Sequence, residues 1–218
     1  MINSESGRSM IEMLGVLAVI GVMSVGGITG YTKMMSQYKI NKAIQQIGQI
    51  SSKLTAIGSG ASSYEGLNNA SAIKFDAIPA EARNGSGSDL TNPFDGKIII
   101  EAAPLLSASD LPTAGAVDRQ AYTISYTDLP EDACMALGSH NWYGGRNTNL
   151  IGIGIVPAET QLGTVASLLY QGCDGDKSGN NLAACSSGAT YSTPLSVQTV
   201  ASVCNCPNDT CAIIFKFF

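Results

Sequence analysis

Six cysteines are the residues of this chain that are best suited to covalent chemistry, and all of them follow residue 133. An even number of cysteines confined to one part of a chain indicates a disulfide framework, which forms in an oxidising compartment such as the periplasm or the extracellular space. Zinc binding is the alternative, but the sequence has no C-x2-C pair and a single histidine, which disfavours it. The six are Cys134, Cys173, Cys185, Cys204, Cys206 and Cys211.

The connectivity of these cysteines stays open at this point, because six cysteines allow fifteen pairings. Two of the possible pairs would close short loops. Cys173 with Cys185 would enclose a stretch rich in Gly, Asn and Ser, and Cys206 with Cys211 would enclose a tight turn.

A calcium site is the second chemistry that the residue types suggest. Oxygen-bearing side chains stand at alternate positions after Cys173, with Gly179 where a calcium loop turns sharply. The twelfth position of that loop is Cys185 rather than glutamate, so the bidentate ligand is missing and a solvated turn is the preferred interpretation. The candidate ligands are Asp174, Asp176, Ser178 and Asn180.

Catalysis is not expected from this sequence. It contains no G-x-S-x-G motif, no phosphate-binding loop and no dinucleotide fingerprint, and no nucleophile is paired with a recognisable base. The single histidine, His140, excludes a multi-histidine metal centre, and no cofactor is expected. The net charge of −5 and the lack of a Lys/Arg cluster argue against a nucleic-acid-binding surface.

The element that dominates the N-terminal part is a helix. Met13 to Thr32 form 20 residues without a charge, enough to span a bilayer of about 30 Å as a helix. Apolar residues then recur at three- and four-residue steps as far as Ile57, and Gly58-Ser59-Gly60 supplies a stop. We predict one helix from about Arg8 to Ile57, apolar all round at first and amphipathic afterwards.

Two features of this helix could carry function. Glu12 places a charge at the start of the apolar run, where a charge is costly, so it is either a helix N-terminal acid at the lipid interface or a group that a partner cation neutralises. Four glycines weaken the helix and are either ordinary small residues of a transmembrane interface or a site of bending. They are Gly21, Gly26, Gly27 and Gly30.

Charge divides the chain into two parts. Between Met13 and Tyr64 there are four lysines and no acid, whereas from Glu65 onward there are 15 acids and 7 bases, a net −8. The chain therefore has an apolar and then basic stem followed by an acidic head.

The stretch Gly7-Arg8-Ser9-Met10-Ile11-Glu12, followed by the apolar run, resembles the type IV prepilin signature. The resemblance implies that a prepilin peptidase cuts between Gly7 and Arg8 and methylates the new amino terminus on Arg8. It also implies that Glu12, then the fifth residue, meets the amino terminus of a neighbouring subunit. Two residues depart from the family pattern: the leader carries Glu5 and no basic residue, and Arg8 replaces the usual apolar residue.

The head, residues 59–218, is predicted to be α+β. A turn at Asn92–Gly96 precedes the first of four expected strands, and four short helices are expected. The strands are Lys97–Glu101, Ala121–Thr127, Leu150–Val156 and Cys211–Phe218, the last of them central. The helices are one capped by Ser62, Pro130–Leu137, Pro157–Tyr170 and one opened by Thr193-Pro194.

This order of elements is similar to the heads of type IVb pilins, in which the long N-terminal helix lies across an antiparallel sheet. The resemblance implies a disulfide between Cys134 and Cys204. We therefore expect four segments: a leader (1–7), a transmembrane or fibre-core helix (8–32), the amphipathic half of the same helix (33–58) and a periplasmic or extracellular head (59–218).

The resulting expectation is the major subunit of a type IV pilus. The precursor would sit in the inner membrane of a bacterium with its head in the periplasm, and would then join identical subunits in an extracellular helical filament. Its other partners would be the prepilin peptidase, membrane lipid, and an inner-membrane assembly platform driven by an external ATPase. The alternatives are a minor pilin or a type II secretion pseudopilin and, from another class, a single-pass membrane-anchored periplasmic binding protein.

Overall fold

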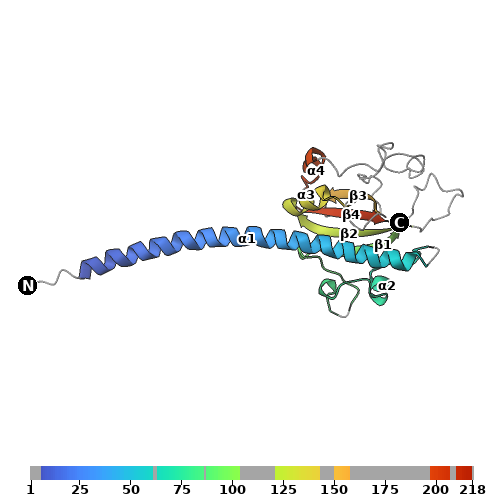
Figure 1. Ribbon diagram of the computed structural model, residues 1–218, viewed down its shortest axis with the longest axis horizontal. Coiled ribbons are helices and arrows are strands. Elements are labelled where there is room, and N and C mark those ends of the chain that lie inside the picture. The colour runs from blue at the N-terminus through green and yellow to red at the C-terminus, as the bar shows by residue number, and fades with distance from the viewer. Residues whose placement is uncertain are drawn as a thin grey trace, which may run out of the picture. The chain divides into compact units, whose positions relative to one another are not determined.

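The computed structural model describes residues 6–60, 63–85, 87–103, 121–142, 150–157, 197–206 and 210–217. Contacts divide the chain into two units, Met1–Lys39 and Ile40–Phe218. The boundary falls inside the segment predicted to be the amphipathic half of the first helix. Figure 1 labels the helices and strands in chain order.

The first helix, α1, runs from Ser6 to Gly58, within two residues of the predicted bounds at each end. Within the described residues it includes the only stretch long and apolar enough to cross a membrane, located in Met10–Gly58, with a mean hydropathy of 2.1 in its most apolar window. None of that window is buried. The sequence left open whether its glycines are a site of bending or ordinary small residues of a transmembrane interface. The helix is continuous through Gly26, Gly27 and Gly30.

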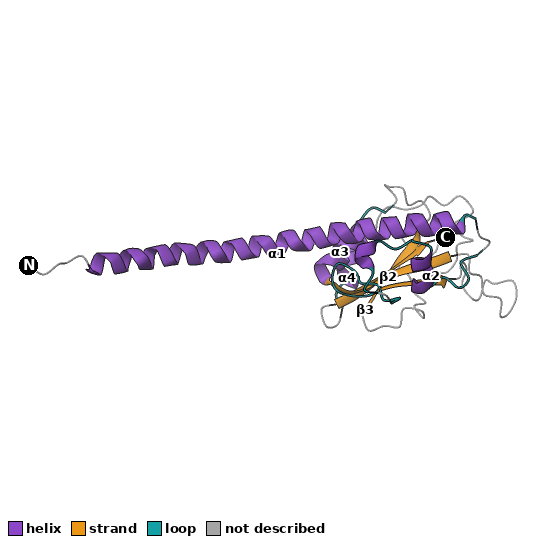
Figure 2. Cartoon of the chain, turned by 90° about the horizontal axis from the view of Figure 1, so that it is seen from below, coloured by secondary structure: helices purple, strands orange, loops and turns teal. Residues whose placement is uncertain are grey.

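Four antiparallel strands form one sheet in the second unit. They are β1 (Ile98–Ala103), β2 (Ala121–Pro130), β3 (Leu150–Pro157) and β4 (Thr210–Phe217). The order across the sheet is β1-β2-β4-β3, so β4 is central, as predicted from its apolar sequence. Figure 2 shows the strands grouped against the C-terminal part of α1. Helix and sheet together form the predicted α+β head.

The C-terminal part of α1 packs on one face of this sheet through apolar and hydrogen-bonded contacts. Ile47, Ile50 and Leu54 are fully buried there. The hydroxyl of Tyr122 in β2 donates to the Ser51 carbonyl oxygen at 2.9 Å, and the hydroxyl of Tyr126 donates to the Gln46 side-chain oxygen at 3.4 Å. These bonds satisfy tyrosine hydroxyls that would otherwise be costly to bury, and burial raises the pKa of both tyrosines.

A buried asparagine fixes the turn before β1 to an irregularity in β2. Asn92 accepts hydrogen bonds from the amides of Phe94 (2.8 Å) and Gly96 (3.1 Å), and its side-chain amide donates to the Thr127 carbonyl oxygen at 2.8 Å. The pairing of β2 with β4 shifts register between Tyr126 and Leu129. A Cβ on Gly96 would collide with the Thr127 carbonyl oxygen, so this turn requires glycine.

Replacing this asparagine tests how much the turn stabilises the head. Asn92→Ala should lower the free energy of unfolding by about 2–3 kcal/mol, because it leaves buried backbone groups without partners. Denaturant unfolding of the detergent-solubilised chain, followed by tryptophan fluorescence, measures the loss. The exposed Asn84 is the matched control, and Asn84→Ala should change stability by less than about 0.5 kcal/mol. Equal losses in the two variants would contradict the role given to Asn92.

A second asparagine occupies the outer edge of β1. The side chain of Asn69 donates to the Ile98 carbonyl oxygen (3.0 Å) and accepts from the Ile100 amide (2.8 Å), as a paired strand would. The Ala102 amide donates to the Leu67 carbonyl oxygen at 3.2 Å, and the Ile98 amide to the Leu90 carbonyl oxygen at 3.0 Å. Four backbone groups on the outer edge of β1 are therefore bonded within the same chain: the amide and carbonyl of Ile98 and the amides of Ile100 and Ala102.

Asn69 is held there by α2 (Asn69–Lys74), a helix whose start was predicted wrongly. The capping box lies at Asn68 and Ser71, each of which bonds the backbone amide of the other, rather than at Ser62. Gly66 adopts a φ of 79°, which interrupts any helix begun before it, and the described residues 63–67 contain none. Ser62 itself lies outside the described residues.

The remaining described helices are η1 (Ala80–Ala82), α3 (Glu131–Ser139) and α4 (Val197–Val203). The helix predicted at Pro130–Leu137 corresponds to α3, with Pro130 as its N-cap. The helix predicted at Pro157–Tyr170 does not include Pro157, which ends β3, and its other residues lie outside the described ones. Also outside the described residues are the start at Thr193-Pro194, the pair Cys173 and Cys185, and the calcium candidates Asp174, Asp176, Ser178 and Asn180.

Candidate assembly site

Glu12 lies in the first turns of α1, and its side chain is exposed. Within the described part of the chain no basic side chain pairs with its carboxylate. Gly7 and Arg8 also have helical backbone, but the Arg8 side chain is outside what the structure describes. An isolated carboxylate beside an apolar surface requires either water or a cation from another molecule.

The surface of α1 that follows Glu12 is apolar and open. Its large aliphatic side chains are each more than half exposed, from Met13 to Ile28. A Cβ built at any of the glycines Gly15, Gly21, Gly26, Gly27 or Gly30 would meet nothing within 4 Å. The surface can therefore be approached closely by lipid chains or by another helix.

Polar residues in this part of α1 are satisfied within the helix. The Ser24 hydroxyl donates to the Ile20 carbonyl oxygen at 2.8 Å, and the Thr29 hydroxyl lies 3.0–3.1 Å from the carbonyl oxygens of Gly26 and Val25. Such back-bonding removes the need for water at these side chains. The segment can thus enter an apolar environment without leaving hydroxyl groups unpaired.

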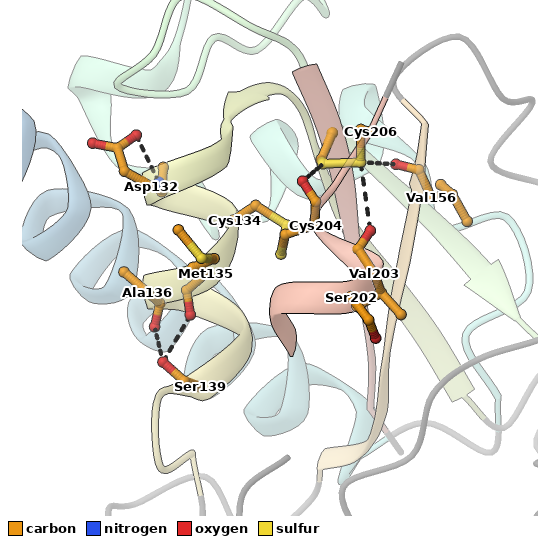
Figure 3. The surroundings of a disulfide bond; sticks show 12 residues. Asp132, Cys134, Met135, Ala136, Ser139, Val156, Ser202, Val203, Cys204 and Cys206 are labelled. Atoms are coloured by element: carbon orange, nitrogen blue, oxygen red, sulfur yellow. Dashed lines mark hydrogen bonds between the residues drawn. A yellow bond between two sulfur atoms is a disulfide. The ribbon is translucent and has the colours of Figure 1, made fainter. Parts of the chain in front are cut away.

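Two disulfides join the helices of the head to its central strand, as Figure 3 shows around Cys134, Cys204 and Cys206. Cys134 of α3 bonds to Cys204, directly after α4, across 70 residues, with the Cα atoms 5.8 Å apart. Cys206 bonds to Cys211 at the start of β4. The first pair is the one that the resemblance to type IVb pilins implied, and the second closes the tight turn noted in the sequence.

The region around these disulfides is closely packed. The Sγ of Cys211 lies 3.3 Å from the Cys204 carbonyl oxygen, which brings the two disulfides together. A Cβ on Gly138 of α3 would come within 3.1 Å of Val200 in α4 and 3.2 Å of Ile155 in β3. The first disulfide thus fixes two helices that already touch each other and the sheet.

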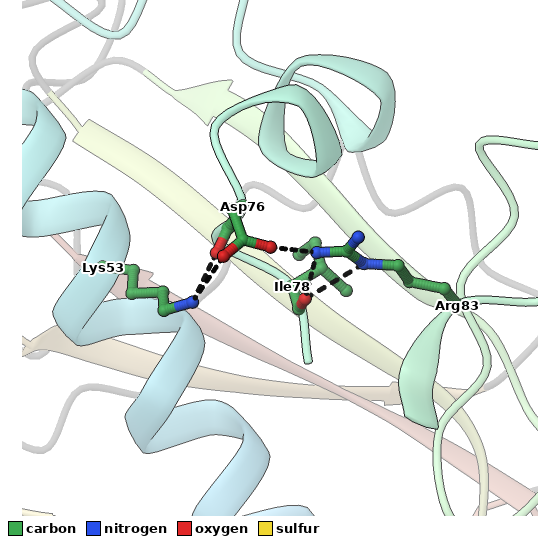
Figure 4. A network of polar contacts seen from close by, with 4 residues as sticks. All are labelled: Lys53, Asp76, Ile78 and Arg83. Atoms are coloured by element: carbon green, nitrogen blue, oxygen red, sulfur yellow. Dashed lines mark hydrogen bonds and ion pairs between the residues drawn. The ribbon is translucent and has the colours of Figure 1, made fainter. Parts of the chain in front are cut away.

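An exposed carboxylate links α1 to the chain after α2, a contact that the sequence did not predict (Figure 4). The guanidinium of Arg83 lies 2.6 Å from the Asp76 carboxylate, and the ammonium of Lys53 lies 3.5 Å from it. Arg83, then Lys53, hold the pKa of Asp76 below its usual range. The stability that these ion pairs add to the fold is fully present above the pKa of unfolded Asp76. It is lost as the pH falls through the lowered pKa of the folded state.

His140 and Trp142 follow directly after α3. The indole of Trp142 is buried, donates to the Leu137 carbonyl oxygen at 3.0 Å and packs edge-on against Phe215. The His140 ring contacts the indole at 4.7 Å, and burial lowers the pKa of His140. Trp142 thus belongs to the core, and the half-buried His140 packs against its ring.

These features correspond to those of a known class of proteins. The crystal structure of TcpA, a type IV pilin from Vibrio cholerae El Tor biotype, matches 83% of this chain and 99% of that chain, with a TM-score of 0.52 at 16% identity. A type IV b pilin from Salmonella typhi is less similar: 80% of this chain, 97% of that chain, TM-score 0.46 and 16% identity. The fold is that of a type IV pilin.

Sequence comparison identifies the family. Residues 37–216 match the family model PilS, described as PilS N terminal, and the chain belongs to this family of type IV pilins. The chain is also 25% and 26% identical, over 137 residues, to the major structural subunit of bundle-forming pilus from Escherichia coli O127:H6 and O111:H-. The matched region is 63% of this chain and 65% of each relative, slightly less than two thirds of their length.

Proposed function

We propose that this chain is the major subunit of a type IVb-like pilus and polymerises through α1 into a surface fibre. The observation that carries the proposal is the exposed surface of α1, which has no charge from Met13 to Thr32 and begins at Glu12, in a chain whose head has the pilin fold. The relatives named as bundle-forming pilus subunits support the same function.

The apolar surface of α1 needs a different partner before and after assembly. In the precursor it crosses the bacterial inner membrane, with the head in the periplasm where its disulfides form. In the fibre the same surface packs against the helices of identical subunits. Lipid and packed side chains are similarly apolar, so this exchange gives little net hydrophobic gain. An external ATPase on the assembly platform must therefore supply the work of extraction.

Glu12 sets the register of packing in this proposal. Its carboxylate would pair with the amino terminus of a neighbouring subunit, which the prepilin peptidase creates by cutting between Gly7 and Arg8 and then methylates. A buried ion pair adds little stability but penalises every misaligned arrangement, because each one leaves a charge unpaired. The glycines Gly21, Gly26, Gly27 and Gly30 would let neighbouring helices approach closely.

N-terminal mass spectrometry of sheared surface fibres is the experiment that tests the function. A methylated Arg8 start in abundant fibre material is the expected result. A processed chain that is scarce in fibres would favour a minor pilin or a type II secretion pseudopilin. An uncut chain confined to the membrane fraction would favour a membrane-anchored periplasmic binding protein and would overturn the proposal.

Processing can be tested by changing the leader glycine. Gly7→Leu should prevent cleavage, because a bulky residue replaces the glycine of the peptidase motif, and the chain should run as a heavier band on a denaturing gel. Gly15→Ala is the matched control, since a Cβ at Gly15 meets nothing in the described structure. It should be processed normally. A mature amino terminus in the Gly7→Leu variant would contradict the assigned cleavage site.

A further inference from the structure

The part of α1 that directly follows the uncharged run has an unusual composition. Tyr31–Lys39, which we call the collar, contains two tyrosines, two lysines and two methionines and no acid. Tyr31 is 66% exposed, Tyr38 is 60% exposed and Lys33 is exposed. The collar ends at Lys39, which is half-buried and is the last residue of the first unit, Met1–Lys39.

The spacing of these residues fits the boundary of a bilayer. Tyrosine is enriched at the level of lipid headgroups, because its ring is apolar and its hydroxyl is polar. With a rise of 1.5 Å per residue, Lys33 lies about 3 Å and Lys39 about 12 Å beyond Tyr31 along the helix. The headgroup layer on each side of the hydrocarbon is about 5–8 Å thick, and a charge acts over about 10 Å at ordinary salt.

The charge of the collar selects the type of lipid. The last acidic residue before it is Glu12, at the opposite end of the apolar run, and the next in the chain is Glu65. Lysine ammonium groups at a headgroup layer attract phosphate groups that carry net negative charge, at about 1 kcal/mol for each lysine. Lipids with zwitterionic headgroups carry no net charge and therefore attract the lysines less strongly.

We propose that the collar binds anionic phospholipid headgroups and concentrates such lipids around α1 before assembly. This inference rests on the proposed function, because it requires α1 to span a membrane in the precursor. Leaving the bilayer for the fibre then breaks the lysine–phosphate contacts as well as the apolar ones. The collar thus defines where along α1 the membrane holds the subunit.

The test measures which lipids surround the collar in the full chain. Tyr31→Trp introduces a reporter, and the unsubstituted chain, which carries only Trp142, gives the background. The protein is reconstituted into vesicles that mix phosphatidylcholine and phosphatidylglycerol, with either lipid brominated to quench fluorescence. At low salt, phosphatidylglycerol should quench the reporter with at least about fivefold preference, and 1 M NaCl should remove that preference.

Replacing the collar lysines tests whether the lipid preference depends on the collar or only on the net charge of the chain. Lys33→Gln with Lys39→Gln, in the reporter background, should bring the preference to within about twofold of equal quenching. The control is Lys74→Gln with Lys97→Gln, which removes the same charge from exposed lysines of the head and should leave the preference intact.

Three outcomes would overturn the inference. Equal quenching by the two lipids in the reporter chain would contradict the inference. It would still show the collar at the bilayer, so the proposed function would not be affected. A preference that survives loss of both collar lysines, or that is lost equally in the head control, also removes it. If neither brominated lipid quenches the reporter, the collar does not lie at the bilayer, and the inference fails.

Discussion

Glu12→Ala should produce a subunit that is processed and membrane-bound but that forms at least about tenfold less surface fibre than the unsubstituted chain. The substitution leaves the apolar surface of α1 intact, so insertion into lipid is retained. It removes the carboxylate that would neutralise a neighbouring amino terminus, and an unpaired charge buried in a fibre core costs about 3–5 kcal/mol. Immunoblots of sheared fibre and membrane fractions measure the two pools.

Two further variants show whether the charge is responsible. Glu12→Gln keeps the size and polarity of the side chain but not its charge, and it should assemble nearly as poorly as the alanine variant. Glu65 is an exposed glutamate of the head, and Glu65→Ala should leave fibre yield unchanged. Normal fibre yield from Glu12→Ala would remove Glu12 from the assembly mechanism.

Loss of the long disulfide should destabilise the head more than loss of the short one. The Cys134–Cys204 bond closes 70 residues, whereas the Cys206–Cys211 bond closes 5. If the bonds act through the entropy of the unfolded chain, replacing both cysteines of the long loop by alanine costs about 4 kcal/mol, and the short loop about 2 kcal/mol. Denaturant unfolding of the full chain, followed by the buried Trp142, measures both losses.

The short-loop variant is the matched control, because the two disulfides lie side by side and each substitution removes two sulfur atoms. Equal losses would mean that local packing around α3 and α4, rather than loop length, determines the stability. A negligible loss from the Cys134→Ala and Cys204→Ala pair would contradict the view that this bond stabilises the head.

The helix and the strands could be predicted because their signals are local and long. The run from Met13 to Thr32 has no charge, and the apolar spacing that continues to Ile57 fixes a single helix whose observed end is Gly58. The Cys211–Phe218 segment is apolar at nearly every position, which predicted a central strand, and β4 is buried from Cys211 to Phe217. Patterns of this kind report burial directly.

The contacts that hold the head together could not be predicted, because they join residues far apart in the chain. Asn92 was recognised only as part of a turn, and its bond to Thr127 spans 35 residues. Asp76 had no visible partner, since Lys53 lies 23 residues before it. The helix placed at Ser62 was wrong because two capping patterns competed, and Gly66, with its positive φ, excluded the first. The role of Glu12 stays a prediction.

The bonded outer edge of β1 affects how copies of this chain behave when many of them are crowded together. An open sheet edge is a template on which another chain can add a strand, and crowded subunits with such edges would aggregate irreversibly. In this head the side chain of Asn69 already occupies the backbone groups of Ile98 and Ile100, and Leu67 occupies the amide of Ala102. Heads brought close together are thereby hindered from adding a strand along this edge of the sheet.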